Sequence, residues 1–349
     1  MSAAPAAVRG GAPDSRQVCV PSMKATLIHN PGAGDDKQAT IGQVVALLKE
    51  AGYKVRYQSS KEKGWHKALK KAADVVVVAA GDGTVSRVAR RMIGYNVPIA
   101  VLPMGTANNI SKTLGFADLP ITRLIRSWKT ARHVEFDAGH ASGPWGERHF
   151  MEGIGAGLLT SSIPEVRDNK TMDHLQEAGV KVTYAQQIFR EHLADSPPVQ
   201  MQATLDGEDI SGRYVLFEVL NMKYIGPNLF LAPDVEHNDG EFEVVLLTEK
   251  HRNRLHNHIK HWQEGKPRPL TFGARRGSEI EIEWTGFPIH IDDKIWAAKP
   301  GRYGKRRETI SIGVEPKAVT FLVPKDVHEQ EKLAAENARK ARRNVARNQ

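Results

Sequence analysis

The sequence contains little cysteine and no long apolar run. Its one cysteine, Cys19, excludes a framework of internal disulfide bonds and fits the reducing conditions of a cytosol. The longest uninterrupted apolar stretch runs from Val75 to Gly81, whereas a membrane-spanning helix needs roughly 20 such residues. Residues 1–22 lack the basic start and apolar segment of a signal peptide, so we expect them to be a disordered lead. These absences favour a cytoplasmic location.

Acidic residues are fewer than basic ones, and the excess of positive charge points to an anionic partner. The 349 residues include 49 Lys and Arg against 40 Asp and Glu, which gives a net charge of +9. A nucleotide, a nucleic acid or a lipid head group would suit this charge. Hydrophobic residues make up 40% of the chain and charged residues 26%, as is typical of globular proteins with apolar cores. The length predicts two domains.

The first 130 residues alternate between strand and helix patterns. The run from Asp74 to Ala80 is continuous and β-branched, which suits a strand buried on both faces of a parallel sheet. The expected strands are 24–30, 53–58, 74–80 and 97–102, and the expected helices include 38–51 and 65–72. This alternation predicts a doubly wound α/β domain over residues 23–130.

The pattern changes after residue 130 to short alternating runs separated by turns such as Asp206-Gly207 and Asp239-Gly240. The expected strands are 133–137, 199–205, 214–220, 241–247, 279–284 and 288–292, and the expected helices are 181–194 and 251–263. Residues 131–304 therefore predict an antiparallel β-sandwich domain. A last strand at 318–323 is expected to return to the first domain, which would then include about 305–325, ahead of a basic helical tail at 326–349.

The strongest motif follows the buried strand, where Gly81-Asp82-Gly83-Thr84 opens a helix. Glycines let a backbone approach a phosphate closely, and a helix N-terminus offers free N–H groups and the positive end of its dipole. The carboxylate of Asp82 is a hard oxygen ligand of the kind that Mg²⁺ prefers. A tight turn in which Asp82 or Thr84 only caps the helix is the structural alternative.

Two more small-residue loops follow strands of the same predicted sheet, Pro103–Asn109 and Asn30–Gly34. The carboxyl ends of parallel strands lie at one edge, where open α/β sheets bind their ligands. Three such loops at one edge favour a binding site over a set of turns. The chain contains neither a Gly-x-x-x-x-Gly-Lys-[Ser/Thr] P-loop nor a Gly-x-Gly-x-x-Gly motif after its first strand.

These loops resemble those of the diacylglycerol kinase catalytic-domain family, which includes bacterial lipid kinases related to sphingosine and ceramide kinases. The family's Gly-Gly-Asp-Gly-Thr loop is matched by Ala80–Thr84, and its Pro-x-Gly-Thr-x-Asn-Asp loop by Pro103–Asn109. The resemblance implies a nucleotide-binding α/β domain, a β-sandwich domain and a site in the cleft between them. It also implies ATP- and Mg²⁺-dependent phosphorylation of a lipid hydroxyl, diacylglycerol-like or sphingoid-like.

The resemblance also implies roles for individual residues. Asp82 would organise metal and phosphate, and Asp239 would hold a structural Mg²⁺ with neighbouring backbone carbonyls. The residues expected to bind ATP-Mg²⁺ are Asn30, Ser60, Gly81, Asp82, Gly83, Thr84, Gly105, Thr106 and Asn108.

The sequence departs from the family pattern at the presumed catalytic base. Where the family has Asp-Gly-Glu, this chain has Asp292-Asp293-Lys294, so that a lysine stands in the place of the base glutamate. A charged lysine cannot accept the proton of the acceptor hydroxyl, and Asp293, or second to it Asp292, would serve instead. Arg87 in place of a common glutamate and Asn109 in place of an aspartate are further departures.

Two other functions remain open on the sequence. One is a catalytically weak, nucleotide-binding relative that docks on membranes, which Lys294 motivates. The other is an NAD kinase-like enzyme, since such enzymes carry similar Gly-Asp-Gly loops. Nucleic-acid binding has only the overall charge in its favour and no motif. The oligomeric state is open, with a homodimer as one alternative.

The positive charge is concentrated in two segments. Residues 339–349 carry +5, and residues 251–276 carry a net +6. Basic residues near an anionic membrane contribute roughly 1 kcal/mol each to binding. We therefore expect transient, peripheral contact with the inner membrane surface, in keeping with a lipid substrate.

Overall fold

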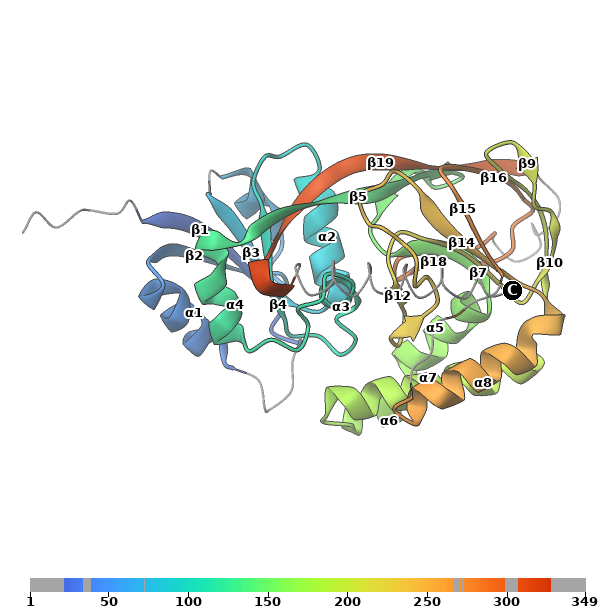
Figure 1. Ribbon diagram of the computed structural model, residues 1–349, viewed down its shortest axis with the longest axis horizontal. Coiled ribbons are helices and arrows are strands. Elements are labelled where there is room, and N and C mark those ends of the chain that lie inside the picture. The colour runs from blue at the N-terminus through green and yellow to red at the C-terminus, as the bar shows by residue number, and fades with distance from the viewer. Residues whose placement is uncertain are drawn as a thin grey trace, which may run out of the picture.

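The computed structural model describes residues 22–33, 39–71, 73–266, 270, 273–298 and 307–327. The α/β half and the β half lie side by side, and two long strands connect them (Figure 1). Among the described residues, no helix combines the length and apolar character that a membrane crossing requires. The expected lead at 1–22 and the expected tail at 326–349 fall almost wholly outside the described residues.

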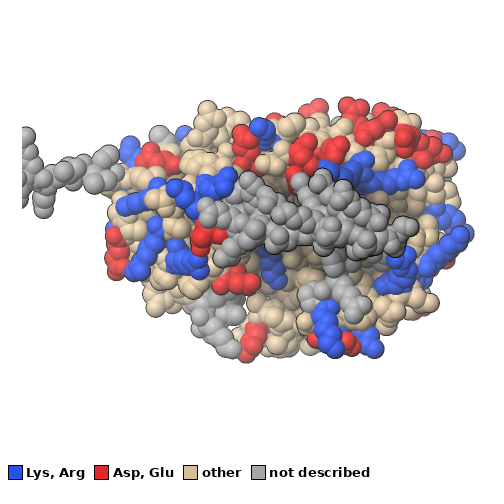
Figure 2. Space-filling view, in the orientation of Figure 1, with Lys and Arg blue, Asp and Glu red and all other residues tan. Residues whose placement is uncertain are grey.

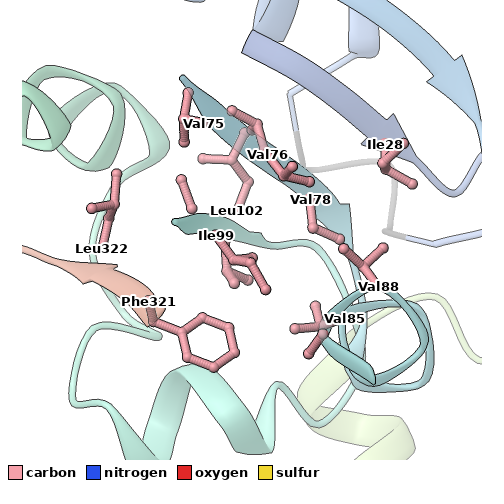
Figure 3. Close-up of a cluster of buried hydrophobic side chains, with 14 of the residues drawn as sticks. Ile28, Val75, Val76, Val78, Val85, Val88, Ile99, Leu102, Phe321 and Leu322 are labelled. Carbon is pink, nitrogen blue, oxygen red and sulfur yellow. The ribbon is translucent and has the colours of Figure 1, made fainter. Parts of the chain in front are cut away.

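Four parallel strands in the order β2-β1-β3-β4 form the sheet of the N-terminal half. The central strand β3 is buried along its whole length, because helices cover both faces of the sheet. Figure 3 shows Val76 and Val78 of β3 with Val85 and Val88 of the following helix in this core. The strands are β1 (Met23–His29), β2 (Tyr53–Ser59), β3 (Val75–Ala80) and β4 (Ile99–Pro103).

The helices of this half follow the loops after the strands. Helix α1 (Ile41–Glu50) begins with a capping box between Thr40 and Gln43, which satisfies free N–H groups of its first turn. The segment expected as a helix at 65–72 is a 3₁₀ helix, η1 (Trp65–Lys70). The other helical segments of this half are α2 (Asp82–Met92), α3 (Asn109–Thr113), α4 (Ile121–Ser127) and η2 (Trp128–Thr130).

The long strand β19 (Glu308–Val323) belongs to both halves. Near its end Phe321 pairs with Ile99 of β4 in parallel, whereas its first residues pair antiparallel with β16 (Glu279–Trp284) of the β half. Strand β5 (Arg132–Gly143) runs beside it, and the register changes at a bulge between Glu315 and Val319. One sheet of 11 strands therefore extends through the molecule and couples the halves.

The β half adds a second, six-stranded sheet in the order β15-β14-β11-β7-β17-β18. A core that includes Phe150, Phe242 and Ile282 holds the two sheets together, and this confirms the predicted β-sandwich. The second sheet consists of β7 (Gly153–Gly157), β11 (Leu216–Leu220), β14 (Phe242–Leu247), β15 (Ala274–Gly277), β17 (Ile289–Ile291) and β18 (Lys294–Trp296). The remaining strands are β6 (Gly146–Phe150), β8 (Val199–Leu205), β9 (Glu208–Asp209), β10 (Gly212–Tyr214), β12 (Tyr224–Ile225) and β13 (Leu229–Phe230).

The glycine-rich segment Gly153–Gly157 is an element that the sequence analysis does not predict. It is strand β7 and pairs with β11 on one side and β17 on the other. A Cβ atom on Gly155 would lie 2.1 Å from Oε2 of the buried Glu218 on β11. Glycine is required here because a charged side chain occupies the space beside the strand.

Four helices cover one side of the β half, at the lower right of Figure 1. Helix α7 packs against both α5 and α8, and their buried side chains include Leu159, Phe189 and Leu255. The first two of the four were not predicted from the sequence. The helices are α5 (Leu158–Asp168), α6 (Lys170–His174), α7 (Ala178–Asp195) and α8 (Arg252–Gln263), the last preceded by η3 (Glu249–His251).

Charge is unevenly distributed over the surface. On the face in Figure 2, acidic side chains gather at the upper right, and basic ones lie at the left and the lower right. Part of the basic segment 251–276 is engaged by other groups of the protein. Arg252 donates to the carbonyls of Leu193 and Ser196, and Arg276 pairs with Asp239. Fewer cations of this segment are therefore free for a membrane than its net charge suggests.

Candidate functional site

The loops after β3 and β4 touch each other through two glycines. A Cβ atom on Gly105 would lie 2.3 Å from Cα of Gly81, and one on Gly81 would lie 2.9 Å from Cα of Gly105. Backbone atoms cannot move aside as a flexible side chain can, so any other residue at either position would push the loops apart. The glycines thus hold two loops in contact at the carboxyl edge of the sheet.

Asp82 and Asn108 fasten the same two loops. Oδ1 of Asp82, the first residue of α2, accepts a hydrogen bond from the N–H of Ile110 at 3.1 Å. Asn108 has a left-handed backbone with φ of 54°. Its side chain accepts from the N–H of Gly105 at 2.8 Å and donates to the carbonyl of Gly105 at 2.9 Å. Both side chains therefore contribute to the shape of the loops, whatever else they bind.

The first loop and Ser60 lie at the same edge. The N–H of Asn30 donates to Ala79 at the end of β3, and the N–H of Ser60 donates to His29 at the end of β1. The side chain of Asn30 accepts from the N–H of Gly32 at 3.1 Å. The hydroxyl of Ser60 is buried and finds no hydrogen-bond partner among the described residues. A buried hydroxyl without a partner is rare in folded proteins and fits a position that contacts a ligand.

A cavity of about 460 Å³ opens beside these loops, between the α/β half and the helices of the β half. Its two ends differ in chemistry. The polar end includes Asp82, Thr106, Asn109, Glu152, His290, Asp292 and Asp293. The apolar end includes Leu159, Ile163, Val166, Met172, Val182, Ala185 and Phe189, from α5, α6 and α7. The cavity is amphipathic and has its carboxylates next to the glycine loops.

Glu152 is a central member of the polar end that the sequence analysis missed. It is buried, its Oε2 accepts from Nδ2 of Asn109 at 3.4 Å, and its Oε1 accepts from the hydroxyl of Ser86 at 3.5 Å. Burial, together with the charges of Asp82 and Asp292, raises the pKa of Glu152 well above its ordinary value. Burial also raises the pKa of Asp82, against the backbone hydrogen bonds that the carboxylate accepts. No sequence pattern marks Glu152, because it stands between two short strands.

Two neighbouring aspartates in the turn between β17 and β18 have different surroundings. Asp292, with φ of 49°, accepts hydrogen bonds from the N–H groups of Met151 and Glu152 at 3.1 and 2.9 Å and pairs with Arg90. Its carboxylate is therefore fully engaged in structure. Asp293 is exposed and lines the cavity, with Oδ2 3.8 Å from the position that a Cβ of Gly83 would take.

Lys294, which aligns with the base glutamate of the family, does not line the cavity. It lines a second pocket together with Ile291, its cross-strand partner in the hairpin. Side chains of paired residues point to the same face of a sheet, so Lys294 follows Ile291 away from the cavity. Within this hairpin, the carboxylates that line the cavity are Asp292 and Asp293.

Asp239 has a protein cation as its partner in this structure. Its Oδ2 pairs with Arg276, and its Oδ1 accepts from the N–H of Glu241 at 3.2 Å. The buried Asp137 holds the same loop by accepting from the N–H of Gly240 at 2.8 Å. Within the described ranges, no three His, Cys, Asp or Glu side chains are grouped as ligands of one metal ion. The role of Asp239 with Mg²⁺ stays a prediction.

Comparisons with known proteins identify both halves of the chain. Residues 24–141 match the model of the diacylglycerol kinase catalytic domain, and residues 161–323 match that of the YegS C-terminal NAD kinase beta sandwich-like domain. The chain is 27% identical over 234 residues to a diacylglycerol kinase of Bacillus subtilis, which covers 64% of this chain and 73% of that protein. It is 22% identical over 324 residues to a diacylglycerol kinase of Staphylococcus haemolyticus. This alignment covers 88% of this chain and 90% of that protein.

A solved structure shows the same fold. A diacylglycerol kinase from Bacillus anthracis aligns with a TM-score of 0.64 at 21% identity and covers 87% of this chain and 98% of that chain.

Proposed function

The chain belongs to the diacylglycerol kinase catalytic-domain family, and from this premise we propose that it transfers the γ-phosphoryl group of ATP to the hydroxyl of a lipid. The observation that carries the proposal is the amphipathic cavity next to the glycine loops. An acceptor with a polar hydroxyl end and an apolar tail matches both ends of this cavity. A diacylglycerol and a sphingoid base both meet this description.

The apolar end of the cavity supplies the lipid-binding surface. Leu159 and Ile163 of α5 face it together with Val182 and Phe189 of α7. Burial of apolar surface contributes about 25 cal/mol per Å². The affinity for an acyl chain between these helices would therefore increase with the length of the chain and would not depend on directed contacts. The acceptor hydroxyl would then lie at the polar end, near Asp82.

The glycine loops supply the donor site. The N-terminus of α2 presents backbone N–H groups and a positive dipole end beside Gly81 and Gly83, as a phosphate group requires. Thr84, Gly105, Thr106 and Asn108 complete the two loops, while Asn30 and the unpartnered hydroxyl of Ser60 lie at the same sheet edge. Phosphoryl transfer needs mainly positioning and neutralisation of charge, which this edge is suited to provide.

The polar end also fits a divalent cation shared with the donor. Asp82 and Glu152 are close enough for the charge of one to raise the pKa of the other, a repulsion that a cation would relieve. Mg²⁺ in kinases is held by one or two carboxylates together with phosphates of the substrate, so a cage of three protein ligands is not needed. When bound there, Mg²⁺ supplies positive charge next to the transferring phosphoryl group.

Asp293 is the residue that we assign to the acceptor hydroxyl. Its carboxylate is exposed in the cavity and lies close to Gly83 of the donor loop, where it can accept the proton of the hydroxyl. Asp292 is the weaker candidate, because Arg90 and two backbone N–H groups already engage its oxygens. Lys294 lines the other pocket, so its charge lies away from the place that we propose for the acceptor hydroxyl.

A lipid substrate implies contact with a membrane. Lys181 and Arg167 line the cavity beside its apolar end, and the adjacent Val180 is 47% exposed. Cations next to an exposed apolar side chain suit an anionic membrane surface. We therefore propose a cytoplasmic protein that meets the inner membrane surface transiently through the start of α7.

The test is phosphorylation of a panel of diacylglycerols, sphingoid bases and glycerolipids with labelled ATP and Mg²⁺. We expect a labelled lipid product that disappears in the Asp293→Asn variant, whereas Asp292→Asn mainly lowers stability. A purified, folded protein that labels no lipid would overturn the proposal, and labelling of NAD instead would favour the NAD kinase-like alternative.

A further inference from the structure

A second pocket, of about 260 Å³, lies on the other side of the turn between β17 and β18. We refer to it as the cationic pocket. Its lining contains five cations and one carboxylate: Arg87, Arg90, Arg91, Arg148, Lys294 and Glu147, together with His149, Ile291 and Trp296. So large an excess of one sign within one pocket is a feature that a ligand of opposite charge would stabilise.

Three of these cations remain available to a ligand. Arg91 and Arg148 lie over the rings of Trp65 and Trp296 at 5.1 and 5.3 Å, and Lys294 is exposed. In the part of the chain that the structure describes, none of the three forms a salt bridge with a carboxylate. NH1 of Arg91 donates to the carbonyl of Arg87 at 3.0 Å, so its other N–H groups and those of Arg148 are left for a ligand.

The crowding of like charges within the cationic pocket supports the same conclusion. Burial, and then the charges of Arg90 and Arg87, lower the pKa of Arg91. Positive groups that disfavour one another in this way gain from an anion placed between them. Arginines with planar donor groups are suited to phosphate oxygens, whereas a ribose hydroxyl is typically held by a carboxylate.

The cationic pocket adjoins the donor loop directly. Nε of Arg87 donates to the carbonyl of Gly83 at 3.2 Å, and its NH2 donates to the hydroxyl of Thr84 at 3.0 Å. Asp293, on the far side of the turn, lies near the same Gly83 but faces the acidic cavity. The donor loop therefore lies between the acceptor cavity and the cationic pocket.

We propose that the cationic pocket binds a phosphate group of a ligand that extends from the donor loop, so that the ligand carries at least two phosphates in a chain. The inference deepens the proposed function and rests on it for the position of the first phosphate, at Gly81–Thr84. In-line transfer keeps the donor on the side away from the acceptor, which directs its remaining phosphates toward Arg91, Arg148 and Lys294. The ligand class is a polyphosphate, free or carried by a nucleotide.

The experiment is calorimetric titration of inorganic tripolyphosphate into the full chain, which needs no lipid and no turnover. We expect the variant Arg91→Gln/Lys294→Gln to bind at least about tenfold more weakly than the wild type, since each charge-assisted hydrogen bond contributes roughly that factor. The matched control Lys49→Gln/Lys54→Gln removes two exposed cations from α1 and β2 and should bind as the wild type does. Equal affinity of the pocket variant, or no binding by the wild type, would overturn the proposal.

Two further measurements distinguish a polyphosphate ligand from a single phosphate and from a lipid head group. Orthophosphate should be bound weakly and equally by wild type and variant; a tenfold loss for orthophosphate would show a site for a single phosphate instead. Co-sedimentation with phosphatidylglycerol vesicles should not change; a loss there with unchanged tripolyphosphate binding would assign the pocket to a lipid head group. Arg148→Gln serves as the second variant if the double variant fails to fold. If tripolyphosphate binding depends on the pocket but no lipid is labelled, the lipid kinase activity is contradicted and the phosphate site of the pocket stands.

Discussion

The acidic cavity and the cationic pocket are separated by little more than one hairpin turn. Asp293 faces a cavity whose other polar residues include Asp82 and Glu152, and its neighbour Lys294 faces a pocket lined by arginines. The buried ion pair between Arg90 and Asp292 lies at the boundary. The comparison teaches that this protein separates charges of opposite sign across the turn of one hairpin, with one neutralised pair between them.

The two regions also differ in how they use their charges. Glu152 and Asp292 of the cavity are buried, and burial together with the charges of Asp82 and Asp292 raises the pKa of Glu152. In the pocket, Arg91 and Lys294 are exposed, and Arg91 and Arg148 lie over tryptophan rings. Repulsion among the carboxylates of the cavity therefore destabilises the folded protein until a cation binds. The cations of the pocket are hydrated, so their repulsion destabilises it less.

The largest expected effect comes from the acidic side. Asp82→Asn keeps an oxygen for the N–H of Ile110 but removes the charge, so the loops should stay in place. We expect lipid phosphorylation to fall by about a thousandfold, in the range typical of a catalytic carboxylate. The matched control is Glu50→Gln, which also replaces a carboxylate by an amide but at an exposed position of α1. The turnover of both variants is compared with that of the wild type. Activity within a few-fold of the wild type would sink the role assigned to Asp82.

The second prediction concerns the ion pair between Arg90 and Asp292 at the boundary of the two regions. Burial raises the pKa of Asp292 and the charge of Arg90 lowers it, so Arg90→Gln should raise it further. A carboxyl whose pKa is raised by folding costs stability as the pH climbs above its unfolded value of about 3.9. We therefore expect a loss of about 3 kcal/mol in unfolding free energy at pH 7, and a clearly smaller loss at pH 4.

Urea unfolding at the two pH values measures this loss. Arg123→Gln is the matched control, because its pair with Asp326 is half exposed on both sides and should contribute less than about 1 kcal/mol. A loss for Arg90→Gln that does not depend on pH would mean that Asp292 is not the group left unpaired.

The glycine contact between the two donor loops should be sensitive to a single methyl group. In Gly105→Ala the new Cβ would meet backbone at 2.3 Å, and we expect a loss of about 2 kcal/mol in unfolding free energy together with weaker nucleotide binding. Gly313→Ala has no atom within 4 Å of the new methyl and serves as the control. Thermal unfolding with and without ATP measures both effects. An unchanged melting temperature would show that the loops can separate freely.

The smallest effect is a gain in stability on the acidic side. Glu152→Gln removes a charge whose pKa is raised by burial and by Asp82. Because ionised Glu152 costs the folded state free energy above its unfolded pKa, the variant should be more stable by about 1 kcal/mol at pH 8 and equal to the wild type near pH 4. Guanidinium unfolding across this pH range checks the sign. A variant that is less stable at pH 8 would contradict the repulsion among these carboxylates.

The local elements of the α/β half were predictable because each carries its own pattern. The continuous run that forms β3 and the glycine loop after it were both visible in the sequence, and the family and the two-domain fold are confirmed. In the β half, Glu279–Trp284 was predicted with its observed bounds, since apolar residues alternate with glutamates.

The elements that were missed depend on distant partners. Strand β7 contains no apolar pattern, and only its pairing with β11 and β17 makes it a strand. Helix α5 contains Pro164 and begins directly after that strand, so no cap or periodicity announced it. As a consequence, the apolar end of the cavity could not be read from the sequence.

The sequence by itself determined the fold class, the family and the placement of glycine loops after β3 and β4, because short-range patterns of burial and turn formation specify them. Only the tertiary structure decided which carboxylates meet. Glu152 joins Asp82 because β5, β6 and β19 bring the β half against the donor loops, and Lys294 leaves the cavity because its hairpin register pairs it with Ile291. These contacts arise from sheet register and from the packing of the two halves, which no local pattern encodes.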